Sequence, residues 1–474
     1  VQDVRPSKEA SMERMKRSTK NSGRGILVGL VILFSVISLL WQSGVSSAQG
    51  QALAPDLTFG TNGKVQTKFS AGGYAYGLAV RADGDIVVVG KAFVDKRDTN
   101  VSVGGIVEYE SSGKPRRSFG QNGVVLNTKM TYANTVIEQP DGKLVVEGQI
   151  AGAQAQAFVI ARYNADGSLD TSFGDAGEVS DSYLGPNDGV ARLALQPDGK
   201  ILVAGTADTT PSGATQRTGI FAVARYNSDG TVDTSFGASG KVTTGFNPGY
   251  TLITAVTVQS DGKILAGGWA GTADADSTTF GIGLARYNSD GSPDSTFGTG
   301  GKTFASISGA SEEIGCLALD SAGNIVVGGV QYFAGGNEAK PDLARFNSAG
   351  VLDTSFGNGG RVDLSSIIGG LISAIRIQSD GQIFVSGFML FPYATAPTGV
   401  FSSRYNSDGT PDGSYNGGTP SDASFYSSFG QPYVGAFEPN GEYVVAGYDR
   451  ALQPTDRFGL PRKFLLLRYQ TGSK

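Results

Sequence analysis

Short apolar stretches alternate with Asp-Gly turns along most of the chain. In residues 189–244, GVARLALQ is followed by the turn PDGK and by ILVAG; after a variable stretch, FAVARYN is followed by SDG and VDTSFGASGKVTT. Because Asp-Gly between two β-rich runs is a strong hairpin signal, this unit predicts four strands. The second strand of each unit is a continuous apolar run, which is typical of a strand covered on both faces.

The same unit recurs through the rest of the chain. A Phe-Gly pair marks the copies at Phe59, Phe119, Phe173, Phe236, Phe297 and Phe356, with Tyr415 in a degenerate seventh copy. A regular spacing of about 60 residues indicates a repeat architecture. Since four-stranded units stacked radially form a β-propeller, the sequence predicts one all-β domain over residues 49–474: a seven-bladed β-propeller of four-stranded blades.

The two ends of the repeat region complement each other. The last copy stops just after its third strand, FLLLRYQ, and residues 56–60, DLTFG, are interpreted as the missing fourth strand of that copy. Pairing the N-terminal strand with the C-terminal blade would close the ring and leave no open sheet edge. We expect a monomer.

Residues 1–48 do not follow the repeat. A basic stretch over residues 14–24 precedes an apolar run over residues 26–41, and small residues follow. This order predicts a secretory signal peptide. Met12 directly precedes the basic stretch, which leaves room for an upstream extension. An uncleaved anchor helix is the alternative, but the run is short against the roughly 20 residues that span a bilayer. We expect a secreted, extracellular, periplasmic or cell-envelope protein without a membrane span after cleavage.

Composition narrows the chemistry open to such a fold. The 474 residues include no histidine and one cysteine, which excludes a Ser-His-Asp triad, a Cys-His dyad, His-ligated zinc and an internal disulfide. The net charge is −5, and residues 1–48 carry more basic than acidic side chains, so the remainder is more acidic still. Because an acidic surface repels phosphate backbones, we expect no nucleic-acid partner.

The repeat motif resembles that of a known family. Copies reading ARYNxDGxxDTSFGxxGKV, as in residues 161–179, 224–242 and 344–362, are similar to the bacterial delta-60 repeat proteins. The resemblance covers nearly all of residues 56–474 and implies a propeller from a secreted or cell-envelope protein. The strand order resembles NHL-type propellers more loosely. Neither resemblance implies a catalytic residue.

Residues present in every copy are interpreted as scaffold. The repeated Asn-x-Asp-Gly-x-x-Asp loops nevertheless bring oxygen ligands together that could hold Ca²⁺, at Asp166, Asp170, Asp229, Asp233, Asp290 and Asp294. The full EF-hand pattern needs more carboxylates and a bidentate glutamate, which are missing. Asx turns and capping account for the same residues. The leading expectation is therefore no cofactor.

The connections between the second and third strands differ between copies. Function in repeat folds usually lies on such variable loops over a rigid frame. Exposed aromatic residues suit stacking on sugar rings or a protein hot spot. The alternative is packing of each loop on its own blade. The candidate ligand-binding residues are Trp269, Tyr332, Phe333, Phe388, Phe391, Tyr393 and Tyr448.

Two glutamates depart from their repeat columns. Glu138 and Glu147 occupy strand positions that are mostly apolar or small in the other copies, and Arg192 also replaces a mostly small residue. A two-residue turn at Asp141-Gly142 would pair Glu138 with Val145 and Glu147 with Val136, which places both carboxylates on one face of the hairpin. The first interpretation is an inter-blade salt bridge with Arg192. The second is the acid and base pair of a glycoside hydrolase.

The sequence is compatible with three functions. The leading one is a non-catalytic binding or scaffold module for a polysaccharide or protein partner on the variable loop face. The alternative is a carbohydrate-active propeller enzyme with Glu138, Glu147 and Arg192 as weak catalytic candidates. The third is a purely structural spacer. Cys316 aligns with small strand residues and is interpreted as a buried packing thiol.

Overall fold

The computed structural model describes residues 53–95, 98, 101–150, 158–181, 189–210, 218–246, 251–271, 280–307, 311–333, 339–367, 369–389, 399–424, 431–450 and 462–471. The predicted signal peptide lies outside these residues. Within them, no helix is both long and apolar enough to cross a membrane.

The described residues form seven antiparallel sheets, each a blade with at least four strands. Blade 1 consists of β3 (Gly73–Val80), β4 (Ile86–Phe93), β5 (Ser102–Tyr109) and β6 (Val124–Asn127). Blade 2 consists of β7 (Met130–Glu138), β8 (Leu144–Ile150), β9 (Phe158–Tyr163) and β10 (Glu178–Asp181). Blade 3 consists of β11 (Gly189–Leu195), β12 (Ile201–Asp208), β13 (Gly219–Tyr226) and β14 (Lys241–Thr244). Blades 4 and 5 consist of β15 (Thr251–Val258), β16 (Ile264–Gly271), β17 (Phe280–Tyr287) and β18 (Lys302–Ala305); and β19 (Ser311–Leu319), β20 (Ile325–Tyr332), β21 (Ala339–Phe346) and β22 (Arg361–Asp363).

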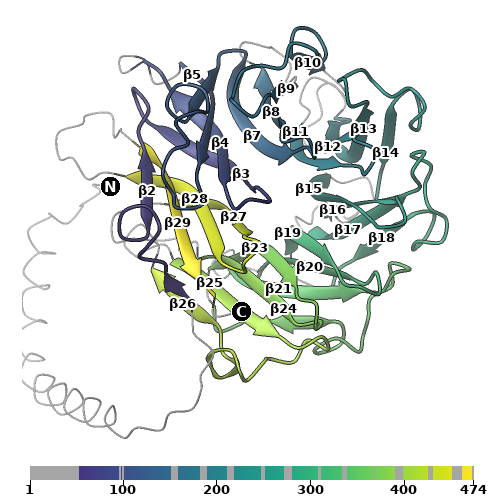
Figure 1. The fold of residues 1–474 in the computed structure, drawn as a ribbon. Coiled ribbons are helices and arrows are strands. Elements are labelled where there is room, and N and C mark those ends of the chain that lie inside the picture. The colour runs from purple at the N-terminus through teal and green to yellow at the C-terminus, as the bar shows by residue number, and fades with distance from the viewer. Residues whose placement is uncertain are drawn as a thin grey trace, which may run out of the picture. The chain divides into compact units, whose positions relative to one another are not determined.

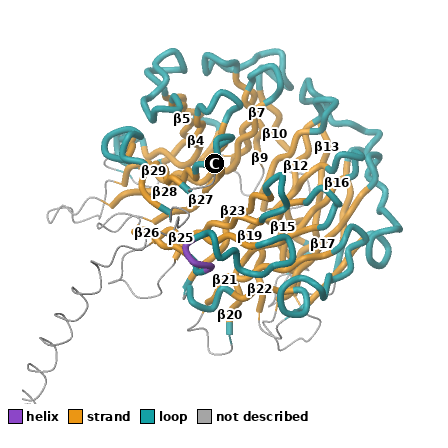
Figure 2. The backbone as a smooth tube through the Cα atoms, turned by 60° about the horizontal axis from the view of Figure 1, so that its bottom comes forward, coloured by secondary structure: helices purple, strands orange, loops and turns teal. Residues whose placement is uncertain are grey.

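Blade 6 consists of β23 (Gly370–Ile377), β24 (Ile383–Met389), β25 (Gly399–Tyr405) and β26 (Ser421–Ser424); blade 7 contains β27 (Gln431–Phe437), β28 (Tyr443–Arg450) and β29 (Arg462–Gln470). A short 3₁₀ helix, η1 (Asn416–Gly418), precedes β26 and is drawn in purple in Figure 2. The predicted fold, a seven-bladed all-β propeller of four-stranded blades, is confirmed.

The blades follow one another around a ring (Figure 1). The first strand of each blade contacts the first strands of both neighbouring blades, from β3 and β7 round to β27 and β3. Seven apolar clusters fill the interfaces between neighbouring blades; in one of them, Val89 of blade 1 packs with Leu144 of blade 2. The core therefore lies between the sheets, which explains why the second strands are apolar on both faces.

The chain closes the ring with its two ends. Strand β2 (Lys64–Thr67) pairs with β29 as the outermost strand of blade 7, and β1 (Ala54–Pro55) pairs with the last residues of β29. The predicted closure is confirmed, but the strand begins later than residues 56–60. The Phe59 N–H donates to the Asp56 carbonyl at 3.1 Å, so this segment forms a turn and the strand begins after it.

Repeated residues bridge neighbouring blades. The Arg162 guanidinium lies 4.7 Å from the centre of the buried Phe173 ring and donates to the Ser228 carbonyl of the next blade. The Gly174 N–H donates to the Asp229 carbonyl, also in the next blade, at 2.7 Å. Equivalent arginine-on-aromatic contacts recur with Arg225, Arg286, Arg345, Arg404 and Arg468. These positions are scaffold.

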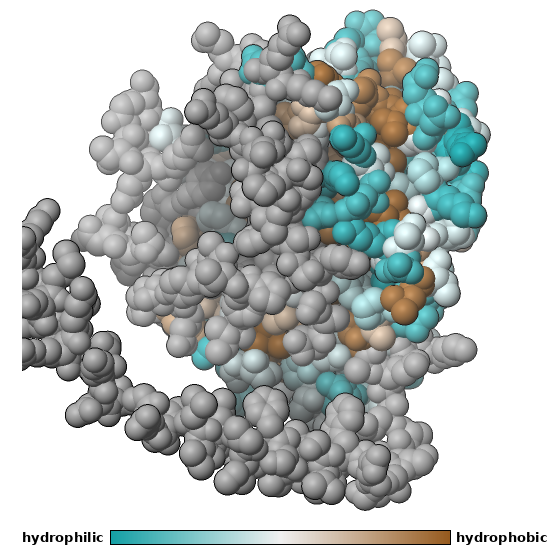
Figure 3. All heavy atoms as spheres, turned by 90° about the vertical axis from the view of Figure 1, so that its left-hand side faces the viewer, coloured by the Kyte–Doolittle hydropathy of each residue, from teal (hydrophilic) through white to brown (hydrophobic). Residues whose placement is uncertain are grey.

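The described part of the outer surface is mixed in character. On the face drawn in Figure 3, hydrophilic and apolar residues are interspersed where the structure describes them.

Candidate functional site

A β-bulge interrupts the first strand of every blade near its start. The residue that falls out of register is Tyr76, Asn134, Ala191, Thr254, Gly315, Ser373 or Tyr433, in blade order. Five of these residues are small or polar, and two are tyrosines. Because bulges redirect side chains and the first strands surround the centre of the ring, the two tyrosines stand out as a local departure from the repeat.

Five tyrosines from three blades are in contact around these bulges, and we call them the tyrosine cluster: Tyr74, Tyr76, Tyr132, Tyr433 and Tyr448. The Tyr76 ring is 5.6 Å from the rings of both Tyr132 in blade 2 and Tyr433 in blade 7, measured between centroids. Tyr74 is stacked with Tyr76 at 6.1 Å and meets Tyr448 edge-on at 5.0 Å. Tyr433 and Tyr448 are 5.6 Å apart. The aromatic surface is continuous across the closure of the ring.

The tyrosine cluster is partly open to solvent. Tyr433 is 40% exposed, Tyr74, Tyr76 and Tyr132 are half-buried, and Tyr448 is buried. Burial, together with the neighbouring Tyr448 and Tyr76, raises the pKa of Tyr433 to about 12. Burial also raises the pKa values of Tyr76 and Tyr132. These hydroxyls stay protonated at neutral pH and can donate hydrogen bonds.

A buried carboxyl group lies beside the tyrosine cluster. Glu147 of β8 is 2% exposed. Burial is the main cause of the raised pKa of Tyr132, and the negative charge of the Glu147 carboxylate is the second cause. Burial raises the pKa of Glu147 to about 8, against a hydrogen bond with Asn134 and the charge of Arg192. Its Oε2 has no hydrogen-bond partner among the described residues. Glu147 is therefore mostly protonated at neutral pH.

The predicted carboxylate pair is wrong. Glu138 pairs with Leu144 and Glu147 pairs with Thr135, one residue out of the predicted register. The turn contains three residues between Gln139 and Lys143 instead of two. Because side chains alternate along a strand, this shift places the two carboxylates on opposite faces of the hairpin.

Glu138 instead joins a salt bridge between blades 1 and 2. The Arg81 Nη2 lies 2.9 Å from Glu138 Oε1, and its Nη1 lies 2.8 Å from Glu108 Oε1. The expected inter-blade salt bridge therefore exists for Glu138, but its partner is Arg81 and not Arg192. Arg192 interacts electrostatically with Glu147 across the interface between blades 2 and 3.

Arg192 and Cys316 belong to the centre of the ring. Arg192 keeps exposed surface, yet desolvation lowers the pKa of its guanidinium, as expected for a group in an enclosed space that solvent still reaches. Cys316 was expected to be buried, but it is half-buried. Its partial burial raises the pKa of its thiol to about 12. Its Sγ lies 3.7 Å from the Gly328 carbonyl oxygen. The thiol therefore stays protonated at neutral pH.

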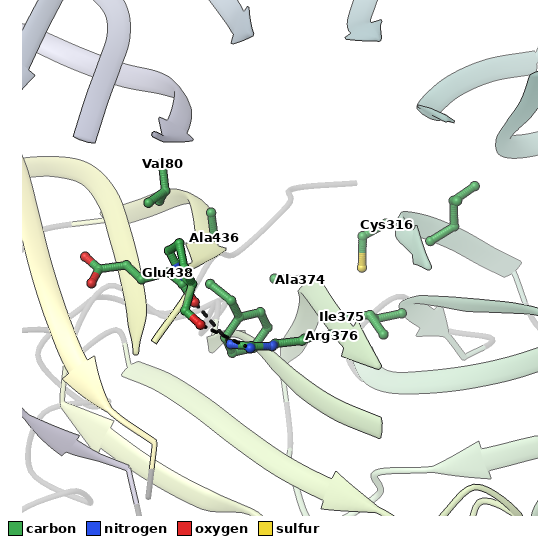
Figure 4. A pocket seen from close by; sticks show the side chains of 10 residues that line it. Val80, Cys316, Ala374, Ile375, Arg376, Ala436 and Glu438 are labelled. Carbon is green, nitrogen blue, oxygen red and sulfur yellow. Dashed lines mark hydrogen bonds between the residues drawn. The ribbon is translucent and has the colours of Figure 1, made fainter. Parts of the chain in front are cut away.

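A cavity of about 520 Å³ lies between the first strands of blades 1, 5, 6 and 7. Figure 4 shows Cys316 and Ala374 on one side of it and Val80 and Ala436 on the other. Arg376 crosses from β23 and donates to the Glu438 carbonyl at 3.1 Å and to the Pro439 carbonyl at 3.3 Å. The Arg376 side chain therefore forms hydrogen bonds between blades 6 and 7.

The predicted loop aromatics do not form one group. Tyr332 is 38% exposed and is hydrogen-bonded to Glu313. The Lys340 ammonium lies 4.8 Å from the centre of the Phe333 ring. The half-buried Trp269 meets Phe280 edge-on at 4.4 Å. Phe388 is buried in the core between blades 6 and 7, which fits the packing alternative, and Phe391 and Tyr393 lie outside the described residues. Tyr448 alone belongs to the tyrosine cluster.

The candidate calcium ligands are engaged within their own loops. Asp166 Oδ1 accepts hydrogen bonds from the Ser168 N–H and hydroxyl at 2.8 and 2.6 Å. Asp170 accepts from Ser172 and from Arg162 Nε, the latter at 2.8 Å. Asp229, Asp233, Asp290 and Asp294 repeat these contacts. Three or more acidic or cysteine side chains placed to hold a metal are not found within the described ranges. The contacts are those of Asx turns and ion pairs.

Four segments match a family described as a domain of unknown function (DUF5122) beta-propeller: residues 139–173, 196–236, 259–297 and 323–356. Each segment begins at the turn after the first strand and ends at the Phe of the Phe-Gly pair, so the match covers the second and third strands of blades 2 to 5. Fold and sequence together thus define a seven-bladed propeller, four blades of which contain segments similar to this family. No curated protein matches the sequence.

Solved structures with a similar fold have little sequence in common with this chain. Polysaccharide lyase Uly1 is 10% identical with a TM-score of 0.45, over 91% of this chain and 96% of that chain. An ulvan lyase of family PL25 is 12% identical with a TM-score of 0.46, over 81% and 93%. The propeller domain of the Trilobed protease from Pyrococcus furiosus is 10% identical with a TM-score of 0.44, over 85% and 96%. With TM-scores below 0.5, these similarities support no conclusion about this chain.

Sequence reasoning missed Tyr74, Tyr76, Tyr132 and Tyr433. Each lies in the first strand of its blade, whereas the predicted aromatic residues were in the loops between second and third strands. The available signal was the repeat column itself, because Tyr76 and Tyr433 stand where the other copies have small or polar residues. Only ring closure, which brings residue 433 beside residue 76, makes them neighbours.

Proposed function

We propose that this protein is a non-catalytic binding module whose tyrosine cluster binds a polysaccharide. The observation that carries the proposal is the continuous contact of tyrosine rings across blades 7, 1 and 2, with Tyr433 40% exposed. Tyrosine rings offer an apolar face for a sugar ring and a hydroxyl for its polar groups.

The proposal includes export and the nature of the repeats. The order of basic, apolar and small residues in residues 1–48 supports a signal peptide and hence a secreted or cell-envelope protein. The motif ARYNxDGxxDTSFGxxGKV supports assignment of the repeats to the delta-60 type. A polysaccharide partner is consistent with a location outside the cytoplasm.

The second candidate is a carbohydrate-active enzyme, and one observation favours it. Glu147 is a mostly protonated acid beside Tyr132 and Arg192, as a general acid would be. A glycoside hydrolase also needs a second carboxylate that faces the same binding cleft, across the scissile bond from the first. Glu138 cannot supply it, because it lies on the opposite face of the hairpin and is held by Arg81. Binding is therefore the better supported function.

Substitution of the exposed rings tests the proposal. In residues 49–474, Tyr433→Ala and Tyr76→Ala are expected to weaken polysaccharide binding by about tenfold each, because buried aromatic contacts carry most of the energy of a binding site. Binding is measured by affinity electrophoresis against neutral and acidic polysaccharides and then by calorimetry. Phe304→Ala, which removes a half-buried ring from the outermost strand of blade 4, is the matched control.

The outcomes separate the candidates. If the tyrosine variants bind as tightly as Phe304→Ala, the tyrosine cluster is not the site. If no polysaccharide binds but a protein partner is captured in a manner that depends on Tyr433, the partner is a protein. If wild type releases reducing or unsaturated sugar ends and Glu147→Gln binds without releasing them, the protein is an enzyme.

A further inference from the structure

Each blade carries a group of charged side chains on the face of the ring opposite the tyrosine cluster. In blade 2 the Asp170 carboxylate lies 2.8 Å from Arg162 Nε and 2.9 Å from Lys143 Nζ. Lys143 comes from the turn between the first and second strands. In blades 3 and 4 the equivalent ammonium groups, Lys200 and Lys263, lie 3.0 and 3.5 Å from Asp233 and Asp294. Three blades thus hold a lysine ammonium against the same arginine–aspartate pair.

Blade 7 has a more acidic version of this group. Glu442 stands in the position of the three lysines, and Glu438 stands where the other blades mostly have glutamine. The Arg468 guanidinium is now shared by three carboxylates: Asp56 at 2.6 Å, Glu442 at 3.1 Å and Glu438 at 3.4 Å. In blades 2 to 4 two cations face two carboxylates, because the turn residues Asp141, Asp198 and Asp261 lie 3.7, 3.8 and 3.2 Å from the three lysines. In blade 7 one arginine faces three carboxyl groups.

A pocket of about 590 Å³ opens at this group, between blades 7 and 1. We call it the seam pocket; its lining includes Glu438, Glu442 and Arg468 from blade 7 and Asp83 and Ser111 from blade 1. The Asp83 side chain is 60% exposed and its nearest ion-pair partner, the Arg116 guanidinium, is 3.7 Å away. The pocket is therefore acidic and open to solvent at its blade 1 side.

Glu438 points independently to cation binding in the seam pocket. It is 3% exposed, and its Oε1 has no hydrogen-bond partner among the described residues. Glu438 lines both the central cavity and the seam pocket, and Figure 4 shows its carboxylate directed away from the other residues that line the central cavity. Burial and the charge of Glu442 raise the pKa of Glu438 to about 7, against the charge of Arg468. A buried carboxyl with an unsatisfied oxygen costs free energy that a cation would recover.

We propose that the seam pocket binds a primary ammonium group, from a lysine side chain of a partner or from a free amine. The repeats themselves supply the geometric precedent, since the arginine–aspartate pair accepts an ammonium from within the chain in blades 2 to 4. Blade 7 has exchanged that lysine for Glu442, so the ammonium must come from outside. This inference does not depend on the polysaccharide site, because the two sites use different residues at different ends of the blades.

Titration with cadaverine tests the proposal. At about pH 8 and low ionic strength, calorimetry on residues 49–474 is expected to give saturable binding that weakens as salt is added. Pentanediol, which has the same length without charge, should not bind. Tetramethylammonium, which has no N–H to donate, should bind at least about tenfold more weakly. Equal binding of cadaverine and tetramethylammonium would overturn the assignment of an ammonium site.

Two variants assign the binding to the seam pocket. Glu442→Lys restores the internal lysine of blades 2 to 4 and is expected to abolish cadaverine binding while keeping or raising Tm. Glu442→Gln should weaken binding by about tenfold, which keeps the test sound if the lysine variant is unstable. Asp175→Lys makes the same change in net charge on the exposed edge of blade 2 and should bind as wild type does.

The source of the ammonium is distinguished by a second probe. Tighter binding of Nα-acetyl-lysine methylamide than of cadaverine identifies a lysine side chain of a partner, and the reverse identifies a free amine; both support the site. Absence of binding by either probe to wild type, or unchanged binding by Glu442→Lys, overturns it.

Discussion

Glu147 acquires its properties from neighbours that the repeat pattern does not reveal. The same column holds Val89, Ala204, Gly267, Gly328, Ser386 and Ala446 in the other blades, all uncharged. A carboxyl group placed there is buried by the adjacent blade, and its proton is retained because burial disfavours the charged form. At the scale of a single residue, burial decides protonation.

The titration of Glu147 predicts an unusual pH dependence of stability. Its pKa is about 8 in the folded chain against 4.5 as the ordinary value, so the folded state binds the additional proton between these pH values. The resulting stabilisation is complete below about pH 4.5 and is lost as the pH rises through 8. The Tm of wild type relative to Glu147→Gln should therefore fall between pH 5 and 9, by on the order of a few °C.

Melting curves at intervals of one pH unit provide the measurement. Glu110→Gln, at an exposed position, serves as the control. A constant difference in Tm between wild type and Glu147→Gln across this range would show that Glu147 is not protonated in the folded state.

At the scale of the element, the bulge in each first strand requires a glycine in the second strand. The residues opposite the bulges are Gly90, Gly148, Gly205, Gly268, Gly329, Gly387 and Gly447. A Cβ atom on Gly268 would lie 1.9 Å from the Leu252 carbonyl oxygen, and one on Gly329 would lie 2.0 Å from that of Glu313. The close approach of two backbones at the bulge explains this conserved geometry among the blades.

Gly268→Ala is therefore expected to destabilise the fold. The added methyl group must displace the backbone of β15, at a cost of about 1–3 kcal/mol or more in the free energy of unfolding. Chemical denaturation measures this change. Gly413→Ala is the control, because a Cβ atom there meets nothing within 4 Å. Equal stability of the two variants would mean that the bulge is not held as tightly as the structure indicates.

At the scale of the whole molecule, one strand from the N-terminal end holds the ring closed. Strand β2 covers the edge of β29 and contributes Val65 and the nearby Phe59 to the core between blades 7 and 1. Asp56 adds the ion pair with Arg468. Without these residues, blade 7 would expose an unpaired strand and part of its apolar face.

Deletion of residues 49–68 in addition to 1–48 should cause aggregation or a large fall in Tm. Light scattering and differential scanning calorimetry measure these effects, with residues 49–474 as the reference. A truncated chain that stays monomeric and melts at the reference temperature would contradict the closure of the ring by β2.

Most of the fold could be predicted from the sequence, whereas the site could not. The strands, the number of blades and the closure follow from apolar runs, Asp-Gly turns and a regular repeat. These signals are local, because each depends on residues that are close in the sequence and on which of them are buried. The prediction that Glu138 and Glu147 lie on one face of the hairpin was wrong. The turn contains one more residue than predicted, which moves the two side chains to opposite faces, and sequence spacing does not reveal turn length.

The sequence by itself determined the repeated architecture, since each blade uses the same short-range hairpins and the same Phe, Arg and Asp scaffold contacts. Only the tertiary structure decided what the exceptions do. The tyrosine cluster joins Tyr76 to Tyr132 and Tyr433, and the seam pocket joins Asp83 to Glu442. The physical reason is that closure of the ring brings together residues that lie hundreds of positions apart, and no local pattern in the sequence reveals such a contact.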